Sequence, residues 1–227
     1  MMVDGGFASH VVVPHPKYLI GFGSSVAPAV ACTLACSGLT VLSAVRKLMP
    51  MIPTNPVVLI GAGGLGIQAI AMLRALGHQA IISVDIAEDK RAVVEAAGAQ
   101  YVCGSGEDAR KKIAATAMGP ILGTIDFVNN STTAQMAYDV LAKGGHMVQV
   151  GIMGGELSLS LVGLIFKAVT LSGNMTGNLH HLREVVQLAE SGKLAPIPTT
   201  EIPWNEADNA LARLSEGKVS GRLVLRV

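Results

Sequence analysis

Three glycines with a fixed spacing are the first residues in this sequence whose pattern could do chemistry. Gly61, Gly63 and Gly66 form GxGxxG in the stretch VVLIGAGGLG, directly after a short apolar run and at the start of a helical pattern. There, the first glycine allows a tight turn, the second lets the backbone approach a pyrophosphate, and the third lets the helix pack on a sheet. The helix N-terminus adds free N–H groups and a partial positive charge. The spacing therefore predicts a phosphate-binding turn.

An acidic residue supports the same interpretation. Asp85 ends the next apolar run, AIISVD, about 20 residues further on, where a carboxylate accepts a hydrogen bond from a ribose 2′-OH. Its charge would repel a 2′-phosphate and so favours NAD over NADP, although Lys90 or Arg91 could also reach the ribose. Two alternatives stay open: a tight turn followed by a helix capped by Asp85, and a site for S-adenosylmethionine. The third glycine and a sixth parallel strand favour the dinucleotide.

Two of the three cysteines, Cys32 and Cys36, lie four residues apart in the uncharged stretch ACTLACSGLT. A cysteine in a helix is either a small apolar residue or a metal ligand. A catalytic zinc ion needs three protein ligands and one open position. The sequence contains neither CxxC nor HExxH. By residue type alone, both cysteines are therefore expected to be packing residues.

These residues lie within an alternation of short apolar runs and helical patterns, which indicates a parallel sheet buried on both faces. The predicted strands are 57–61, 80–85, 100–103, 124–130, 146–151 and 168–173. The first predicted helix follows the glycines and ends near residue 76. The other predicted helices cover 88–97, 107–117, 132–142 and 178–192, and a looser turn follows residue 151. The fold class is α/β, a doubly wound parallel six-stranded Rossmann sheet. Residues 5–20 (strand, turn, strand) and 198–227 (strand, helix over 205–216, strand) are expected to pack together as another unit.

Composition restricts the function further. The 227 residues carry a net charge of +1, which gives no basic field for nucleic acid. Three cysteines without a disulfide framework indicate a reducing compartment, the cytoplasm, and the N-terminus has no secretory pattern. Residues 18–45 are uncharged and long enough to span a bilayer. Glycines, serines and Pro28 break that segment into a loop and a shorter helix near a serine cap, so we expect no membrane partner.

Seven ordered segments resemble the zinc-containing medium-chain alcohol dehydrogenase family over nearly the whole chain. They are GGFASHVVVP, ACSGLT, VVLIGAGGLGIQAIAMLRALG, VDIAEDK, LAKGGHMVQVG, LREVVQLAESGKL and GRLVLRV. The resemblance implies three parts: 1–48, the end of a GroES-like catalytic domain with a connecting helix; 49–175, the NAD-binding Rossmann domain; and 176–227, a last Rossmann helix and a return to the catalytic domain. Strand 168–173 resembles the one that joins family members into dimers, which implies a homodimer or homotetramer.

The resemblance also implies individual roles. Cys36 falls at the last of three catalytic zinc ligands, and Thr40 at a catalytic hydroxyl on the nicotinamide side. Leu65 would pack behind the nicotinamide, and the backbone of Val150 and Gly151 would hold its carboxamide. The positions implied for binding NAD are Thr40, Gly61, Gly63, Gly64, Leu65, Gly66, Asp85, Lys90, Val150, Gly151 and Arg222, with Asp85 and Lys90 on the adenosine ribose and Arg222 on the pyrophosphate.

The sequence departs from the family pattern at the metal. The family's glycine-histidine-glutamate motif, first cysteine ligand and four-cysteine zinc lobe lie upstream of the segment at which this sequence begins. The histidines lie where the family has no ligand: His10, His15, His78, His146, His180 and His181. We therefore expect the cofactor-binding portion of an NAD-dependent enzyme that interconverts an alcohol and an aldehyde or ketone, with zinc only if other ligands are supplied. The alternatives are a truncated, non-catalytic NAD-binding module and a zinc-independent reductase of the same superfamily.

Overall fold

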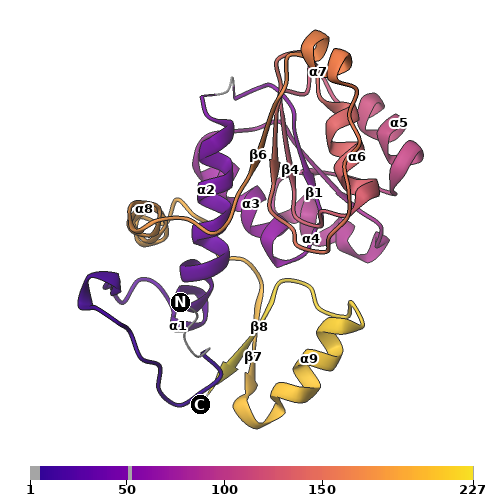
Figure 1. The fold of residues 1–227 in the computed structure, drawn as a ribbon. Helices are drawn as coiled ribbons and strands as arrows, with labels where there is room; N and C mark the ends of the chain where they lie inside the picture. The colour runs from indigo at the N-terminus through magenta and orange to yellow at the C-terminus, as the bar shows by residue number, and fades with distance from the viewer. Residues whose placement is uncertain (1–5, 51–52, 227) are drawn as a thin grey trace.

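A parallel sheet forms the centre of the molecule (Figure 1). The computed structural model describes residues 6–50 and 53–226. The sheet has six strands in the order β3-β2-β1-β4-β5-β6. Their bounds are β1 Val57–Ile60, β2 Ile81–Asp85, β3 Gln100–Cys103, β4 Gly123–Asp126, β5 His146–Gln149 and β6 Thr170–Gly173. The strand order reverses between β1 and β4, so the predicted doubly wound sheet is confirmed.

The central strand explains why the sheet must be covered on both faces. Every side chain of β1, VVLI, is buried. Val57 pairs with Ile81 on β2 and with Gly123 on β4, so β1 has a neighbour on each side. A continuous apolar run between two parallel neighbours is stable only when helices cover both faces.

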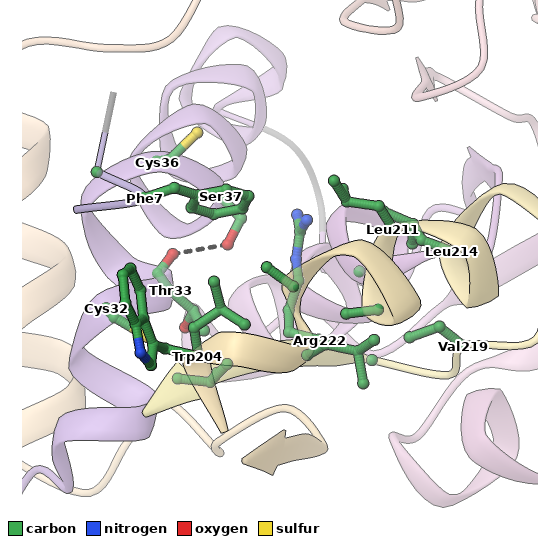
Figure 2. Close-up of a pocket in the computed structure, with 18 of the residues that line it drawn as sticks. Phe7, Cys32, Thr33, Cys36, Ser37, Trp204, Leu211, Leu214, Val219 and Arg222 are labelled. Atoms are coloured by element: carbon green, nitrogen blue, oxygen red, sulfur yellow. Dashed lines mark hydrogen bonds between the residues drawn. The ribbon is translucent and has the colours of Figure 1, made fainter. Parts of the chain in front are cut away.

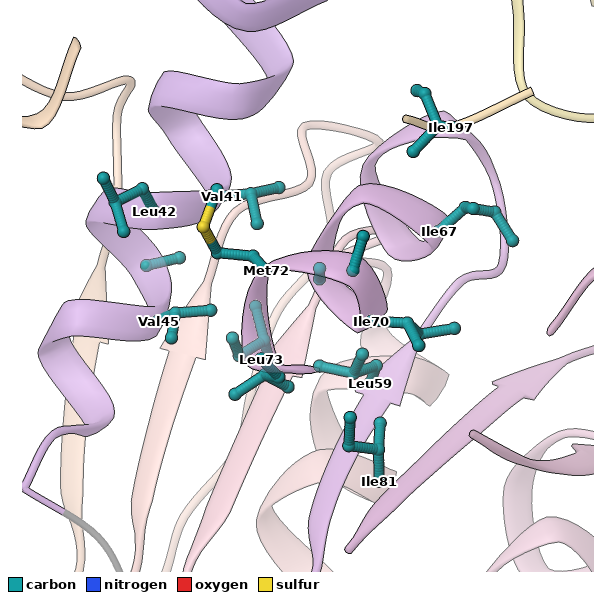
Figure 3. Close-up of a cluster of buried hydrophobic side chains, with 14 of the residues drawn as sticks. Val41, Leu42, Val45, Leu59, Ile67, Ile70, Met72, Leu73, Ile81 and Ile197 are labelled. Carbon is teal, nitrogen blue, oxygen red and sulfur yellow. The ribbon is translucent and has the colours of Figure 1, made fainter. Parts of the chain in front are cut away.

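Helices cover each face of the sheet. One hydrophobic cluster joins the sheet to α2 (Leu39–Leu48), α3 (Gly64–Ala75), α4 (Arg91–Ala96) and α8 (Leu179–Glu190). The other joins the opposite face to α5 (Gly106–Thr116), α6 (Ser131–Val140) and α7 (Leu161–Lys167). Figure 3 shows α2 side chains facing Met72 and Leu73 of α3 above the strands. Leu42 and Leu73 are fully buried, and each such side chain stabilises the fold by roughly 1.5–3 kcal/mol.

The uncharged N-terminal stretch is a core helix. Residues Pro28–Leu48 form one helical run of α1 (Pro28–Thr33), a π-helical turn η2 (Leu34–Gly38) and α2. This run is long and apolar enough to cross a membrane, but 56% of its most apolar window is buried inside the fold. The prediction of a serine cap was wrong, because α1 begins after Ala27 with Pro28 in its first turn. Proline fits there, since the first-turn N–H has no partner inside the helix.

A smaller unit follows the last Rossmann helix. Strands β7 (Thr199–Pro203) and β8 (Arg222–Arg226) form a separate two-stranded parallel sheet, joined by the turn η4 (Trp204–Glu206) and by α9 (Ala207–Ser215). This agrees with the predicted strand, helix and strand. At the other end the prediction was wrong, because residues 6–20 form no strand and contain one 3-10 turn, η1 (Pro16–Tyr18). The 3-10 turn η3 (Glu88–Lys90), which precedes α4, completes the structure.

A buried histidine makes the stability of the fold depend on pH. His78 is 1% exposed, and its Nε2 lies 2.9 Å from the Asn55 carbonyl oxygen. Burial lowers its pKa, so below about pH 6.5 the unfolded chain takes up a proton that the folded chain refuses. The free energy of unfolding should therefore fall on acidification below that pH, by at most about 1.4 kcal/mol per pH unit from this group. Urea unfolding at a series of pH values would measure the slope.

Substitutions separate this histidine from the others. His78→Gln removes this titrating ring and should reduce the slope. Part of the slope should remain, because burial also lowers the pKa values of His146 and His181. His10→Gln, which replaces an exposed ring, is the matched control. Equal slopes for the unmodified chain and His78→Gln would contradict the assignment.

Candidate functional site

The glycine turn has the shape that its spacing predicts. Gly61 has a φ of +97°, a left-handed conformation that favours glycine. A Cβ on Gly66 would lie 1.9 Å from the Gly61 carbonyl oxygen, so α3 can approach β1 only without a side chain there. A Cβ on Gly63 would meet nothing within 4 Å. Gly63 is also the N-cap of α3 and has no side chain to cap it, so the turn leaves open space and free N–H groups at a helix N-terminus.

Asp85 is fixed beside this turn. Its Oδ2 accepts a hydrogen bond of 2.7 Å from the Ala62 N–H, and its Oδ1 accepts one of 3.1 Å from the Ala87 N–H. Each carboxylate oxygen can accept a further bond. The negative charge therefore sits at the carboxyl end of β2, next to the glycines.

Lys90, which was predicted to bind the adenosine ribose, already donates hydrogen bonds to another part of the chain. Its side chain is buried, and its Nζ donates to the Val219 carbonyl at 2.8 Å and to Ser220 Oγ at 3.2 Å. An ammonium group has three donors, so one remains for a ligand. In this structure Lys90 ties η3 to the segment that precedes β8.

Arg222 lies directly over the start of α3. A Cβ on Gly64 would be 2.4 Å from Arg222 Nε, so this glycine makes room for the guanidinium. The Nε atom is buried and has no hydrogen-bond partner among the described residues. Burying a polar group without a hydrogen-bond partner costs free energy. The buried Nε of Arg222 is therefore suited to donate a hydrogen bond to an acceptor atom of a ligand.

A cavity of about 830 Å³ opens beside this arginine. Figure 2 shows the Arg222 side chain rising from β8 between the helix that carries Cys36 and α9. Gly63, Gly64, Cys36 and Arg222 line it together, so the structure brings these four predicted residues to one place. Cys36 belongs to the π-helical turn, a local distortion that is frequent at functional sites.

Cys36 does not form a metal centre with its described neighbours. Its side chain is exposed on the π-helical turn, and Cys32 also lines the cavity. Across residues 6–50 and 53–226, no group of three His, Cys, Asp or Glu side chains could hold a metal ion. A catalytic zinc site needs three protein ligands. The described residues therefore do not fit zinc, and Cys36 contributes at most one ligand.

The residues predicted for the nicotinamide side do not line this cavity. Thr40 is buried on α2, Leu65 packs against the core, and Val150 and Gly151 follow β5. Asn174 ties α2 to the end of β6, because its Nδ2 donates to the Thr40 carbonyl at 3.1 Å and its Oδ1 accepts from Ser43 Oγ at 2.9 Å. Asn174 was not predicted as a site residue. The signal in the sequence is its position directly after an apolar strand, where a polar side chain can be buried.

The turn after β4 was also missed. Asp126 is fully buried at the end of that strand, and burial raises its pKa. Its Oδ1 accepts from the N–H groups of Val128 and Asn129, at 2.9 and 2.8 Å. The run TIDFVNN contained the signal, since an acid and two amides follow a buried strand at the edge where the other site residues lie.

Comparisons with known proteins place this geometry in a family. A family model described as zinc-binding dehydrogenase matches residues 64–191, more than half of the chain. The chain belongs to the zinc-binding dehydrogenase family. This confirms the resemblance on which the sequence-based residue roles depend. The matched range begins at Gly64, after Gly61 and Gly63, and includes Asp85 and the turns after β4 and β5.

Individual members of this family match almost the whole of this chain. An NAD-dependent alcohol dehydrogenase of Sulfolobus acidocaldarius is 36% identical over 99% of this chain and 65% of its own length. One from Sulfurisphaera tokodaii is 36% identical over 98% of this chain and 64% of its own. The crystal structure of the alcohol dehydrogenase of Aeropyrum pernix superposes with a TM-score of 0.84 at 29% identity, over 99% of this chain and 66% of that one. The chain thus spans about two thirds of these relatives.

Proposed function

We propose that this chain is the cofactor-holding part of an NAD-dependent alcohol dehydrogenase. The observation that carries the proposal is the buried Arg222 Nε, which has no partner in the described part of the chain and lies against the glycine turn at the N-terminus of α3. A pyrophosphate would supply acceptors both to this donor and to the free N–H groups of the turn. Asp85 stands beside the same turn, where it would accept from the adenosine ribose.

The chain's residues would bind and orient the cofactor. Bound NAD would supply a hydride acceptor for the oxidation of an alcohol, and NADH a hydride donor for the reduction of an aldehyde or ketone. The backbone of Val150 and Gly151 would hold the carboxamide, Leu65 would pack behind the ring, and Thr40 would contact the reacting side. The substrate class, a small alcohol or the matching carbonyl compound, follows from what the relatives are named for.

Isothermal titration calorimetry with NAD, NADP and ADP-ribose tests the proposal. We expect NAD and ADP-ribose to bind, and NADP to bind at least about tenfold more weakly, because the Asp85 charge opposes a 2′-phosphate. Asp85→Asn keeps the size and one acceptor oxygen, and it should narrow the gap between NAD and NADP. An unmodified chain that binds neither NAD nor ADP-ribose would overturn the proposal.

A second candidate is an NAD-binding module without catalysis, or a reductase of the same superfamily that works without zinc. These alternatives are favoured because Cys36 is not joined by two further metal ligands among the described residues. Elemental mass spectrometry of the purified chain, with Cys36→Ser as the control, separates them from the first proposal. About one zinc per chain, lost in the variant, supports the zinc enzyme. Turnover of alcohol that survives chelation supports the zinc-independent reductase, and NAD binding without zinc or turnover supports the module.

We further propose that two copies of the chain associate through the edge of the sheet. Strand β6 is the last in the strand order, and four apolar side chains of α7 are between 62% and 77% exposed: Leu161, Val162, Ile165 and Phe166. An apolar patch beside an open strand edge is typical of an interaction site.

The three cysteines are free, which agrees with a cytoplasmic protein.

Charge placed in this patch should disrupt the association. Ile165→Lys together with Phe166→Lys is expected to shift the chain from dimer, or tetramer, toward monomer in sedimentation velocity, because charges would be buried without partners. Met118→Lys changes another exposed apolar side chain, 89% exposed and not part of α7 or β6, and should leave the sedimentation coefficient unchanged. A double variant that sediments like the unmodified chain would contradict this interface.

A further inference from the structure

Two turns at the carboxyl edge of the sheet are hydrogen-bonded to each other. The Val150 and Gly151 N–H groups, which follow β5, both donate to the Asp126 carbonyl at the end of β4, at 2.9 and 3.0 Å. The Met153 N–H donates to the Val128 carbonyl at 3.3 Å. A Cβ on Gly151 would lie 2.3 Å from the Val128 carbonyl oxygen, so the two backbones are in direct contact.

Asn129 closes this junction with its side chain. Its Nδ2 donates a hydrogen bond of 2.8 Å to the Gly151 carbonyl. Its backbone has a φ of +61°, a left-handed conformation that few residues besides glycine and asparagine adopt readily. Asparagine therefore satisfies two requirements at one position, the turn of the backbone and a donor for the neighbouring strand end.

The support beneath Asn129 is rigid. Its own N–H donates to the Oδ1 of the fully buried Asp126 at 2.8 Å. The next residue, Asn130, is the N-cap of α6 and forms a capping box with Thr133. The amide of Asn129 is thus presented from a backbone that is fixed on both sides.

The junction also adjoins the phosphate-binding turn. A Cβ on Gly61 would lie 3.0 Å from Cγ2 of Val128, so the turn after β4 contacts the first glycine of the motif. Strand order reverses between β1 and β4, and ligands of such sheets lie in the crevice at this point. The turn that carries Asn129 therefore contacts the phosphate-binding turn through Val128 and the end of β5 through the bond to Gly151.

We propose that Asn129 is a positioning residue for the nicotinamide half of the cofactor, acting through its hydrogen bond to the Gly151 carbonyl. The inference rests on the proposed function, in which the peptide groups of Val150 and Gly151 hold the carboxamide. Because the bond fixes the Gly151 peptide, it fixes that contact. The ADP-ribose half depends on Asp85 and Arg222, and Asn129 forms no hydrogen bond with either of them.

Calorimetric titration of the full chain with NAD and with ADP-ribose, which lacks the nicotinamide, tests the inference. Asn129→Gly removes the amide and tolerates the positive φ, and Asn129→Asp keeps the size and the turn but cannot donate. In both variants we expect the Kd for NAD to rise roughly five- to tenfold, the effect of one hydrogen bond, and the Kd for ADP-ribose to stay within about twofold. Thermal unfolding without ligand shows whether each variant is folded.

The outcomes separate the inference from the proposed function. An unmodified chain that binds neither ligand overturns the proposed function. An unmodified chain that binds both, with variants in which the Kd for NAD is unchanged or rises only as much as that for ADP-ribose, overturns the role of Asn129 alone. A selective loss of NAD affinity in Asn129→Asp supports the inference even if Asn129→Gly does not fold.

Discussion

Gly66→Ala is expected to destabilise the chain by about 3 kcal/mol or more. The new methyl group would lie 1.9 Å from the carbonyl oxygen of Gly61 and 2.9 Å from its carbonyl carbon, and both are backbone atoms that cannot rotate away. Overpacking of this kind forces helix and strand apart at the centre of the sheet. For a chain of this size the melting temperature should fall by roughly 6–12 °C, which differential scanning calorimetry would measure.

Gly63→Ala provides the matched control. Gly63 has a φ of −77°, which alanine adopts freely, and its added Cβ would meet nothing within 4 Å. We expect the melting temperature to stay the same or to rise slightly, since alanine reduces the entropy of the unfolded chain. NAD affinity should nevertheless fall more than tenfold, because the methyl group occupies the space in which a pyrophosphate approaches the backbone. Equal losses of stability in the two variants would contradict the different roles assigned to the two glycines.

The sheet and its glycine turn could be predicted because the information is local. The run VVLI needs burial on both faces, and GxGxxG directly after it fixes the turn that follows. Asp85 could be placed for the same reason, as the last residue of the next apolar run. Each of these features depends on residues that are close together in the sequence.

Elements whose form depends on distant partners could not be predicted. The β-branched run in residues 6–20 was predicted to be a strand, but the structure pairs it with no other strand, and Pro14 and Pro16 provide no N–H for a ladder. A looser turn was predicted after residue 151, but Leu161–Lys167 form helix α7. It forms because Ser160 Oγ accepts from the Gly163 N–H at 3.1 Å and caps a short helix that ends at Ala168 in the left-handed conformation.

The candidate site shows the same division. Residue types and spacing predicted which residues line the phosphate end of the site, and family resemblance added Arg222. The bond between Asn129 and Gly151 joins residues 22 positions apart, and nothing in the sequence shows that their turns meet. The burial of Lys90, whose ammonium group donates to Val219 and Ser220, is likewise a result of how the C-terminal unit packs on the sheet.

Arg222→Gln should separate cofactor binding from stability more sharply than any other substitution outside the glycine turn. We expect NAD and ADP-ribose to bind roughly 10- to 100-fold more weakly, because a hydrogen bond from a charged donor to a phosphate contributes about 1.5–3 kcal/mol. Adenosine, which has no phosphate, should show no change. Calorimetric titration with these three ligands gives all the required constants.

The stability of the same variant tests whether Arg222 is a binding residue or a structural one. Its Nε is buried with no partner among residues 6–50 and 53–226, so burial of this donor costs desolvation that no hydrogen bond within these residues offsets. The melting temperature without ligand should therefore be unchanged or higher in Arg222→Gln. Arg222→Lys keeps the charge but loses the planar fork, and its affinity should lie between those of the unmodified chain and Arg222→Gln. A variant that loses stability and NAD affinity together, with adenosine binding reduced as well, would show that the arginine holds β8 against α3 instead of holding a phosphate.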